Sequence, residues 1–104
     1  MDILVIEDDK LTLGAMQYCI QSLGHNATVA GDGQEAIALI TTNNFDLLIS
    51  DIMMPGISGL SLVNEIRSNY HVTTPIIMMS SLSNVPLLEA AFEAGADDFI
   101  AKPF

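Results

Sequence analysis

Residues 3–9 read ILVIEDD, a short apolar run that ends in three consecutive acidic side chains. Two further apolar runs of similar length follow at residues 46–50 and 75–80. Longer segments, in which apolar residues recur every three or four positions, lie between these runs, and that spacing is typical of helices with one buried face. The alternation of short strands with helices predicts an α/β fold.

The first helix is predicted over residues 10–23. Its apolar residues share one helical face, on which we expect Cys19 to be buried, and Gly24 follows as a stop signal. The residues of this face are Met16, Cys19, Ile20 and Leu23.

Weaker strand signal at residues 26–30 precedes a second helix that extends to about Thr42. Asp32 can cap this helix, and Glu35 can reach back as the partner in a capping box. A third helix is expected over residues 60–67. Asn84 can cap a fourth, which contains residues 87–94 and stops at Gly95. A last strand is expected at residues 98–101.

Five strands with four intervening helices imply right-handed crossovers and a doubly wound parallel sheet. We therefore expect residues 1–104 to form one domain, with a ligand crevice at the carboxyl ends of the strands.

The composition excludes several classes of function. Thirteen acidic and three basic residues give a net charge of -10, which repels nucleic acid phosphates and anionic membranes. No apolar run approaches the roughly 18 residues that a membrane span needs. A single cysteine and the absence of a signal-peptide pattern favour the reducing cytoplasm.

Polar residues stand at or just after four of the expected strands: Glu7 and Asp8, Asp51, Ser80, and Lys102. The carboxyl ends of parallel strands meet at one edge, so these groups should converge. Two carboxylates about 5 Å apart repel by roughly 3 kcal/mol at an effective dielectric near 20, so the three acids demand a cation. Hard oxygen ligands favour Mg²⁺, which keeps some of its waters.

The same edge is suited to phosphoryl transfer. Lys102 supplies a positive charge and Ser80 a hydroxyl group, and together with Mg²⁺ they could hold the equatorial oxygens of a transferring phosphoryl group. Asp51 would then be the nucleophile.

Four segments together resemble the receiver domain of two-component response regulators, and the similarity extends along the whole chain. They are residues 3–9 (ILVIEDD), 51–56 (DIMMPG), 75–81 (PIIMMSS) and 95–104 (GADDFIAKPF). The resemblance implies a flavodoxin-like sheet of strand order 2-1-3-4-5. It also implies a phosphorelay protein that is no enzyme beyond its own phosphorylation and dephosphorylation, with a histidine kinase or phosphotransfer protein upstream and an effector protein or domain downstream.

By this resemblance, Asp51 is the phosphoacceptor and Lys102 the lysine of the family motif. Asp8 would be the chief Mg²⁺ ligand and Glu7 an outer-sphere one, and the Met53 backbone carbonyl would complete the protein ligands.

The resemblance also identifies a switch pair. Ser80 stands at the family's Ser/Thr switch position and Phe99 at its switch aromatic. The Lys102-Pro103 peptide bond would be cis.

Receiver domains usually continue into a fifth helix, whereas this chain stops at Phe104. Without that helix, the sheet face beside the first helix would be partly uncovered, which predicts an interface and a possible homodimer.

Three alternatives remain open. Residues 31–36 (GDGQEA) fit a G-x-G-x-x-A dinucleotide fingerprint, although Asp32 and Glu35 would lie beside the pyrophosphate. A phosphohydrolase with an aspartyl nucleophile usually has a second acid where Met53 stands. A degenerate receiver would bind partners without phosphorylation.

Overall fold

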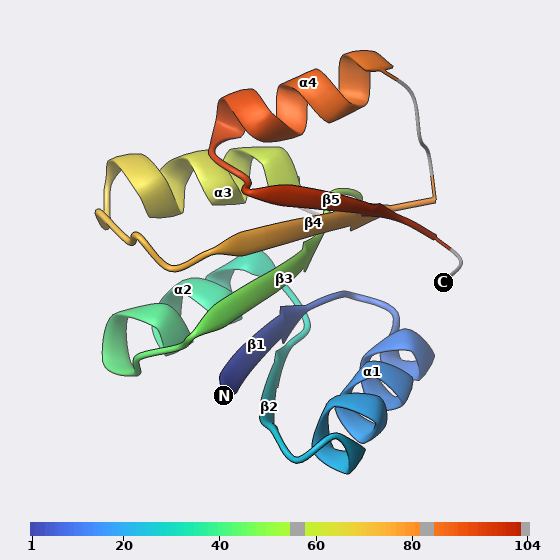
Figure 1. The fold of residues 1–104 in the computed structure, drawn as a ribbon. Coiled ribbons are helices and arrows are strands. Elements are labelled where there is room, and N and C mark those ends of the chain that lie inside the picture. The colour runs from blue at the N-terminus through green and yellow to red at the C-terminus, as the bar shows by residue number, and fades with distance from the viewer. Residues whose placement is uncertain (55–57, 82–84, 103–104) are drawn as a thin grey trace.

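A computed structural model describes residues 1–54, 58–81 and 85–102 (Figure 1). Five strands alternate with four helices in these residues. The elements are β1 (Asp2–Ile6), α1 (Lys10–Ser22), β2 (Asn26–Ala30), α2 (Gly33–Thr42), β3 (Leu47–Asp51), α3 (Gly59–Ser68), β4 (Ile76–Ser80), α4 (Val85–Ala94) and β5 (Asp98–Ala101).

The strands form one parallel sheet in the order β2-β1-β3-β4-β5, which confirms the predicted flavodoxin-like fold. The main core lies between the sheet and the helices α2, α3 and α4, where Leu4, Leu48, Leu62 and Met78 are fully buried. A smaller core lies under α1 on the opposite face. Figure 1 shows α1 apart from the other three helices.

The helix α1 packs on the sheet through Leu13, Met16 and Ile20. The prediction that Cys19 is buried is wrong, because its side chain is exposed. At 3.6 residues per turn, Cys19 lies about a quarter turn from the stripe that contacts the sheet. Leu23 is also exposed, because it is the C-cap residue and lies past the last packed turn. Gly24 follows with φ +90°, as expected of a helix stop.

The start of α2 carries the predicted cap, with one difference. The Glu35 backbone N–H donates to the Asp32 carboxylate at 2.8 Å, but the Glu35 side chain accepts from Gly31 N–H rather than from Asp32. Two carboxylates thus take the N–H groups that a dinucleotide pyrophosphate would need. This geometry argues against the dinucleotide alternative. The Asn84 cap predicted for α4 lies outside the described residues.

The helix α3 begins in direct contact with the end of β3. Gly59 N–H donates to the Ile52 carbonyl at 2.8 Å, and a Cβ atom at position 59 would collide with the Asp51 carbonyl oxygen. It would also lie 2.8 Å from Ile52 Cα, so neither neighbour could yield by rotating a side chain. Glycine therefore allows α3 to pack against the backbone that carries Asp51.

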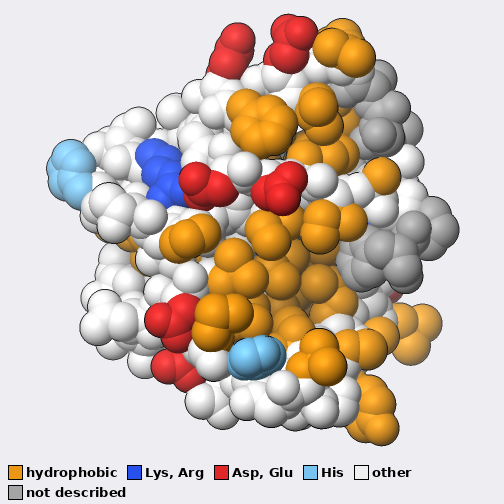
Figure 2. Space-filling view, in the orientation of Figure 1, with side chains coloured by type: hydrophobic (Ala, Val, Ile, Leu, Met, Phe, Trp, Pro, Cys, Tyr) orange, Lys and Arg blue, Asp and Glu red, His pale blue; other side chains and the backbone are white. Residues whose placement is uncertain are grey.

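One face of the sheet beside α1 is only partly covered by the described residues. The alternation of side chains places Leu47, Ile49, Ile77 and Ile100 on this face, and Ile100 is 39% exposed. Figure 2 shows the resulting hydrophobic surface between α1 and α4. A homodimer through this face stays a prediction.

Among the described helices, none combines the length and the apolar character that a membrane span requires.

We expect Gly59→Ala to lower the free energy of unfolding by about 1–3 kcal/mol, because α3 must move away from β3. Each kcal/mol corresponds to a fall of about 4–8 °C in melting temperature for a domain of this size. Gly14→Ala is the matched control, because a Cβ there meets nothing within 4 Å on the surface of α1. Alanine favours the helix by up to about 1 kcal/mol over glycine, so this control should melt slightly higher. A Gly59→Ala protein as stable as wild type would contradict the close contact.

Candidate functional site

The strand register brings the predicted residues to one edge of the sheet. Ile6 pairs with Ser50 between β1 and β3, Asp51 pairs with Met79 between β3 and β4, and Ser80 pairs with Ala101 between β4 and β5. Asp51 and Ser80 are the last residues of their strands, Glu7 and Lys102 are the first residues after theirs, and Asp8 follows Glu7. The convergence expected from the topology is therefore present in the structure.

Two buried carboxylates share one lysine at this edge. Lys102 Nζ lies 2.7 Å from Glu7 Oε2 and 3.1 Å from Asp51 Oδ2. Glu7 is only 2% exposed and Asp51 5%, so both charges are largely removed from water. The positive charge of Lys102 neutralises one of these two buried negative charges.

Asp8 extends the cluster toward solvent. It is exposed, and oxygen atoms of Glu7, Asp8 and Asp51 lie within 4.8 Å of one another. Three carboxylates and one ammonium group leave two uncompensated negative charges. Carboxylate oxygens are the donors that Mg²⁺ prefers, so the chemistry and charge of this set fit a divalent cation.

The environment shifts the pKa values of Glu7 and Lys102. Burial raises the pKa of Glu7 above its ordinary value; the hydrogen bond from Lys102 opposes this change, and the neighbouring Asp51 adds to it. Burial, the largest single influence on Lys102, would lower its pKa, but the hydrogen bonds to Glu7 and Asp51 together raise it. Lys102 is therefore a permanent cation at neutral pH.

The remaining predicted residues lie on β4, on β5 and just after β3. Ser80 is fully buried at the end of β4, and Lys102 N–H donates to its backbone carbonyl at 2.7 Å. Phe99 is half-buried and packs against the main core. Met53 is 59% exposed, and its N–H donates to Asp51 Oδ1 at 3.3 Å. The Met53 carbonyl stays a predicted ligand, and the predicted cis bond at Pro103 lies outside the described residues.

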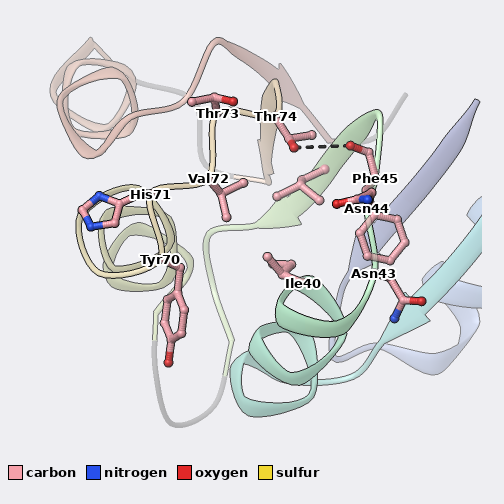
Figure 3. A pocket seen from close by; sticks show the side chains of 10 residues that line it. Ile40, Asn43, Asn44, Phe45, Tyr70, His71, Val72, Thr73 and Thr74 are labelled. Carbon is pink, nitrogen blue, oxygen red and sulfur yellow. Dashed lines mark hydrogen bonds between the residues drawn. The ribbon is translucent and has the colours of Figure 1, made fainter.

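A separate pocket of about 230 Å³ lies at the opposite end of the strands, between the end of α2 and the α3–β4 loop (Figure 3). Its floor is apolar, with Ile40 and Val72, and Thr74 Oγ1 donates to the Phe45 carbonyl at 3.3 Å on one wall. None of its lining residues is a carboxylate, lysine or arginine. It therefore lacks both the carboxylate nucleophile and the lysine that the acidic cluster combines.

One pair of charged residues was not predicted from the sequence. Arg67 Nη2 lies 2.9 Å from Asp97 Oδ2, which links the end of α3 to the α4–β5 turn. The one signal available in the sequence is that Arg67 is the single arginine of a strongly acidic chain.

Comparisons with known proteins identify the family of the chain. The model of the response regulator receiver domain matches residues 3–104. The transcriptional regulatory protein DltR of Streptococcus agalactiae is 36% identical over 104 residues, which are 100% of this chain and 46% of that protein. The chain spans between 27% and 48% of the length of the curated relatives it matches.

Solved structures match equally well. The receiver domain of the Francisella response regulator 1452 has a TM-score of 0.93 at 37% identity, over 99% of this chain and 84% of that one. TrrA of Thermotoga maritima, solved in complex with Mg(2+)-BeF, has a TM-score of 0.87 at 33% identity, over 99% and 87%. With a family match over nearly every residue and the acidic cluster at the expected strand ends, the chain belongs to the response regulator receiver domains.

Proposed function

We propose that residues 1–104 form a receiver domain that accepts a phosphoryl group on Asp51 in a Mg²⁺-dependent reaction. The observation that carries this proposal is the contact of the buried Asp51 carboxylate with Lys102, within 4.8 Å of two further acids. The buried Asp51 lies beside a lysine and within an acidic cluster that has too few positive charges to neutralise it. Such an arrangement suits an electrophile that arrives together with a metal ion.

The chemistry assigns one task to each residue. An Asp51 carboxylate oxygen attacks the phosphorus of a phosphohistidine, a P–O bond forms, and the P–N bond breaks with its electron pair leaving on the imidazole nitrogen. Lys102 stabilises the negative charge of the phosphoryl oxygens, and the Ser80 hydroxyl group donates a hydrogen bond to the same oxygens. Asp8, Asp51 and the Met53 carbonyl would hold Mg²⁺, with Glu7 in the outer sphere. The bound ion would neutralise charge on the transferring group.

The signalling role follows from the same residues. The donor of the phosphoryl group is a histidine kinase or a phosphotransfer protein in the cytoplasm. Phosphorylation would draw Ser80 toward Asp51 and let Phe99 turn inward, which changes the surface formed by α4 and β5 for a downstream effector. The domain itself catalyses only its own phosphorylation and dephosphorylation.

Asp51→Asn should abolish phosphorylation by acetyl phosphate, because an amide is a far poorer nucleophile than a carboxylate. Intact mass after incubation with Mg²⁺ and acetyl phosphate measures the added group. Asp32→Asn is the matched control: it removes one charge at the α2 cap, where asparagine caps equally well. Equal phosphate incorporation by wild type and Asp51→Asn would disprove the assignment.

Millimolar Mg²⁺ should raise the melting temperature, because it relieves the repulsion among Glu7, Asp8 and Asp51. Asp8→Ala should lose this response and should melt higher than wild type without metal. Glu93→Ala removes the same charge from the exposed side of α4 and should keep the full Mg²⁺ response. An unchanged response in Asp8→Ala, measured by thermal scans with and without Mg²⁺, would exclude Asp8 as the main ligand.

Phosphorylated Asp51 should lose its phosphate slowly, because the exposed Met53 beside it has no group to orient or deprotonate a water. Met53→Asn should speed phosphate release, by up to roughly 100-fold for a well-placed group. Met53→Leu keeps the position apolar and should leave the rate unchanged. The rate is followed after the donor is removed, and a rate that Met53→Asn leaves unchanged or slows would show that water access is controlled elsewhere. A second position with this expected role, Leu82, lies outside the described residues.

A further inference from the structure

Arg67, in the last turn of α3, ties two loops together. Its guanidinium group donates from Nη1 to the carbonyls of Val72 at 2.8 Å and Thr74 at 2.7 Å, in the α3–β4 loop. From Nε it donates to the Gly95 carbonyl at 3.0 Å, and from Nη2 to the Asp97 carboxylate at 2.9 Å, both in the α4–β5 turn. One side chain thus joins the start of β4 to the start of β5.

Asp97 completes this connection. Its Oδ2 atom also accepts the Ile76 N–H at 2.9 Å, and its own backbone N–H donates to the Ile76 carbonyl at 2.8 Å. Ile76 is the first residue of β4, and β5 begins immediately after Asp97. The Arg67–Asp97 pair therefore fixes which residue of β4 lies opposite the start of β5.

The α4–β5 turn is shaped around the arginine. Gly95 has φ +120°, a conformation that residues other than glycine rarely adopt. A Cβ atom at this position would lie 2.7 Å from Arg67 Cγ. The apolar stem of Arg67 occupies the space that a side chain at position 95 would need. Arg67, Gly95 and Asp97 thus form one structural unit.

The strand β5 needs such a constraint. It has four residues and pairs with β4 alone among the described strands, and Asp98, Ile100 and Ala101 are exposed. A slip of one residue along β4 would exchange the two faces of β5 and move Lys102 by about 3.3 Å along the strand. The 2.7 Å and 3.1 Å contacts of its ammonium group with Glu7 and Asp51 would then be lost.

We propose that Arg67 and Asp97 are positioning residues that set the register of β5 and thereby hold Lys102 against Glu7 and Asp51 at the far end of the strand. An exposed ion pair alone contributes little, and the Asp97 side chain is 58% exposed. The effect comes from the directed hydrogen bonds of a planar guanidinium group, which a lysine cannot reproduce. The role in phosphorylation rests on the proposed function, whereas the role in strand register does not.

The test uses Arg67→Lys and Asp97→Asn, with Asp98→Asn as the matched control one residue away. The first readout is backbone amide hydrogen exchange in the unphosphorylated protein. Both variants should speed exchange of the Lys102 N–H, which donates to the Ser80 carbonyl, by about tenfold or more, while amides between β1 and β3 keep their protection. Asp98→Asn should exchange as wild type does.

The second readout separates positioning from general stability. Phosphorylation by acetyl phosphate should slow by about tenfold or more, whereas the Kd for Mg²⁺ should change less than about twofold, because Glu7 and Asp8 directly follow β1 and Asp51 ends β3. Combining Arg67→Lys with Lys102→Met should slow the reaction little beyond Lys102→Met alone, because both changes remove the same interaction.

Three outcomes would overturn the proposal: unchanged exchange at Lys102, a normal phosphorylation rate despite faster exchange, or an equal loss of Mg²⁺ affinity and rate. If the wild-type protein accepts no phosphate, the proposed function fails, and the exchange measurement still decides the register. If Arg67→Lys does not fold, Asp97→Asn, which is nearly isosteric with wild type, gives the same comparison.

Discussion

The burial of two carboxylates against a single lysine is the constraint on which the rest of the structure depends. Glu7 and Asp51 are almost completely removed from water, and a buried charge is tolerated only when it is paired and hydrogen-bonded. Lys102 hydrogen-bonds to both carboxylates, but its single positive charge neutralises only one of their two negative charges. With Asp8 included, the cluster keeps a formal charge of -2, from three carboxylates and one ammonium group, which matches a divalent cation. The fold must therefore place three strands, β1, β3 and β5, in one relative register.

Two of these strands are fixed by the core, and the third is not. The strands β1 and β3 lie in the middle of the sheet, where Leu4, Ile6 and Leu48 are buried. Their register is set by burial, because a slip would expose these side chains. Among the described strands, β5 has one neighbour, and Phe99 is its one residue that packs against the described main core. Its register depends on contacts at its two ends, with Arg67 and Asp97 at one end and the buried carboxylates at the other.

The sequence predicts the parts of this arrangement that follow from periodicity and topology. Strand residues 98–101 agree with the structure, and the strand before Glu7 and the strand ending at Asp51 differ by one residue. The cluster could be predicted because parallel strands place their carboxyl ends at one edge.

The errors arise where long-range packing decides the outcome. Cys19 is exposed because α1 contacts the sheet through Leu13, Met16 and Ile20, and no local pattern specifies this choice of stripe. The pairing of Arg67 with Asp97 spans 30 residues. No local signal links an arginine at a helix end to an aspartate in a distant turn. Sequence patterns predict which residues stand at strand ends, but not which contacts hold an edge strand in place.

The two ends of the sheet differ in their charge balance, and this difference limits how far a change at the site can reach. At the amino-terminal end of β5, Arg67 and Asp97 neutralise each other. The Nε and Nη1 atoms of Arg67 donate to backbone carbonyls, which carry no net charge. From Asp97 to Lys102 the chain extends about 17 Å at 3.3 Å per residue. This length is far greater than the 3.1 Å between Lys102 Nζ and Asp51 Oδ2, and the Coulomb energy between two charges falls with their separation. A change of charge at Asp51 therefore acts strongly on Lys102 and weakly on Arg67. The contacts at the Arg67 end of β5 involve none of the residues of the acidic cluster, whereas the contacts of Lys102 at the other end depend directly on the charge at Asp51.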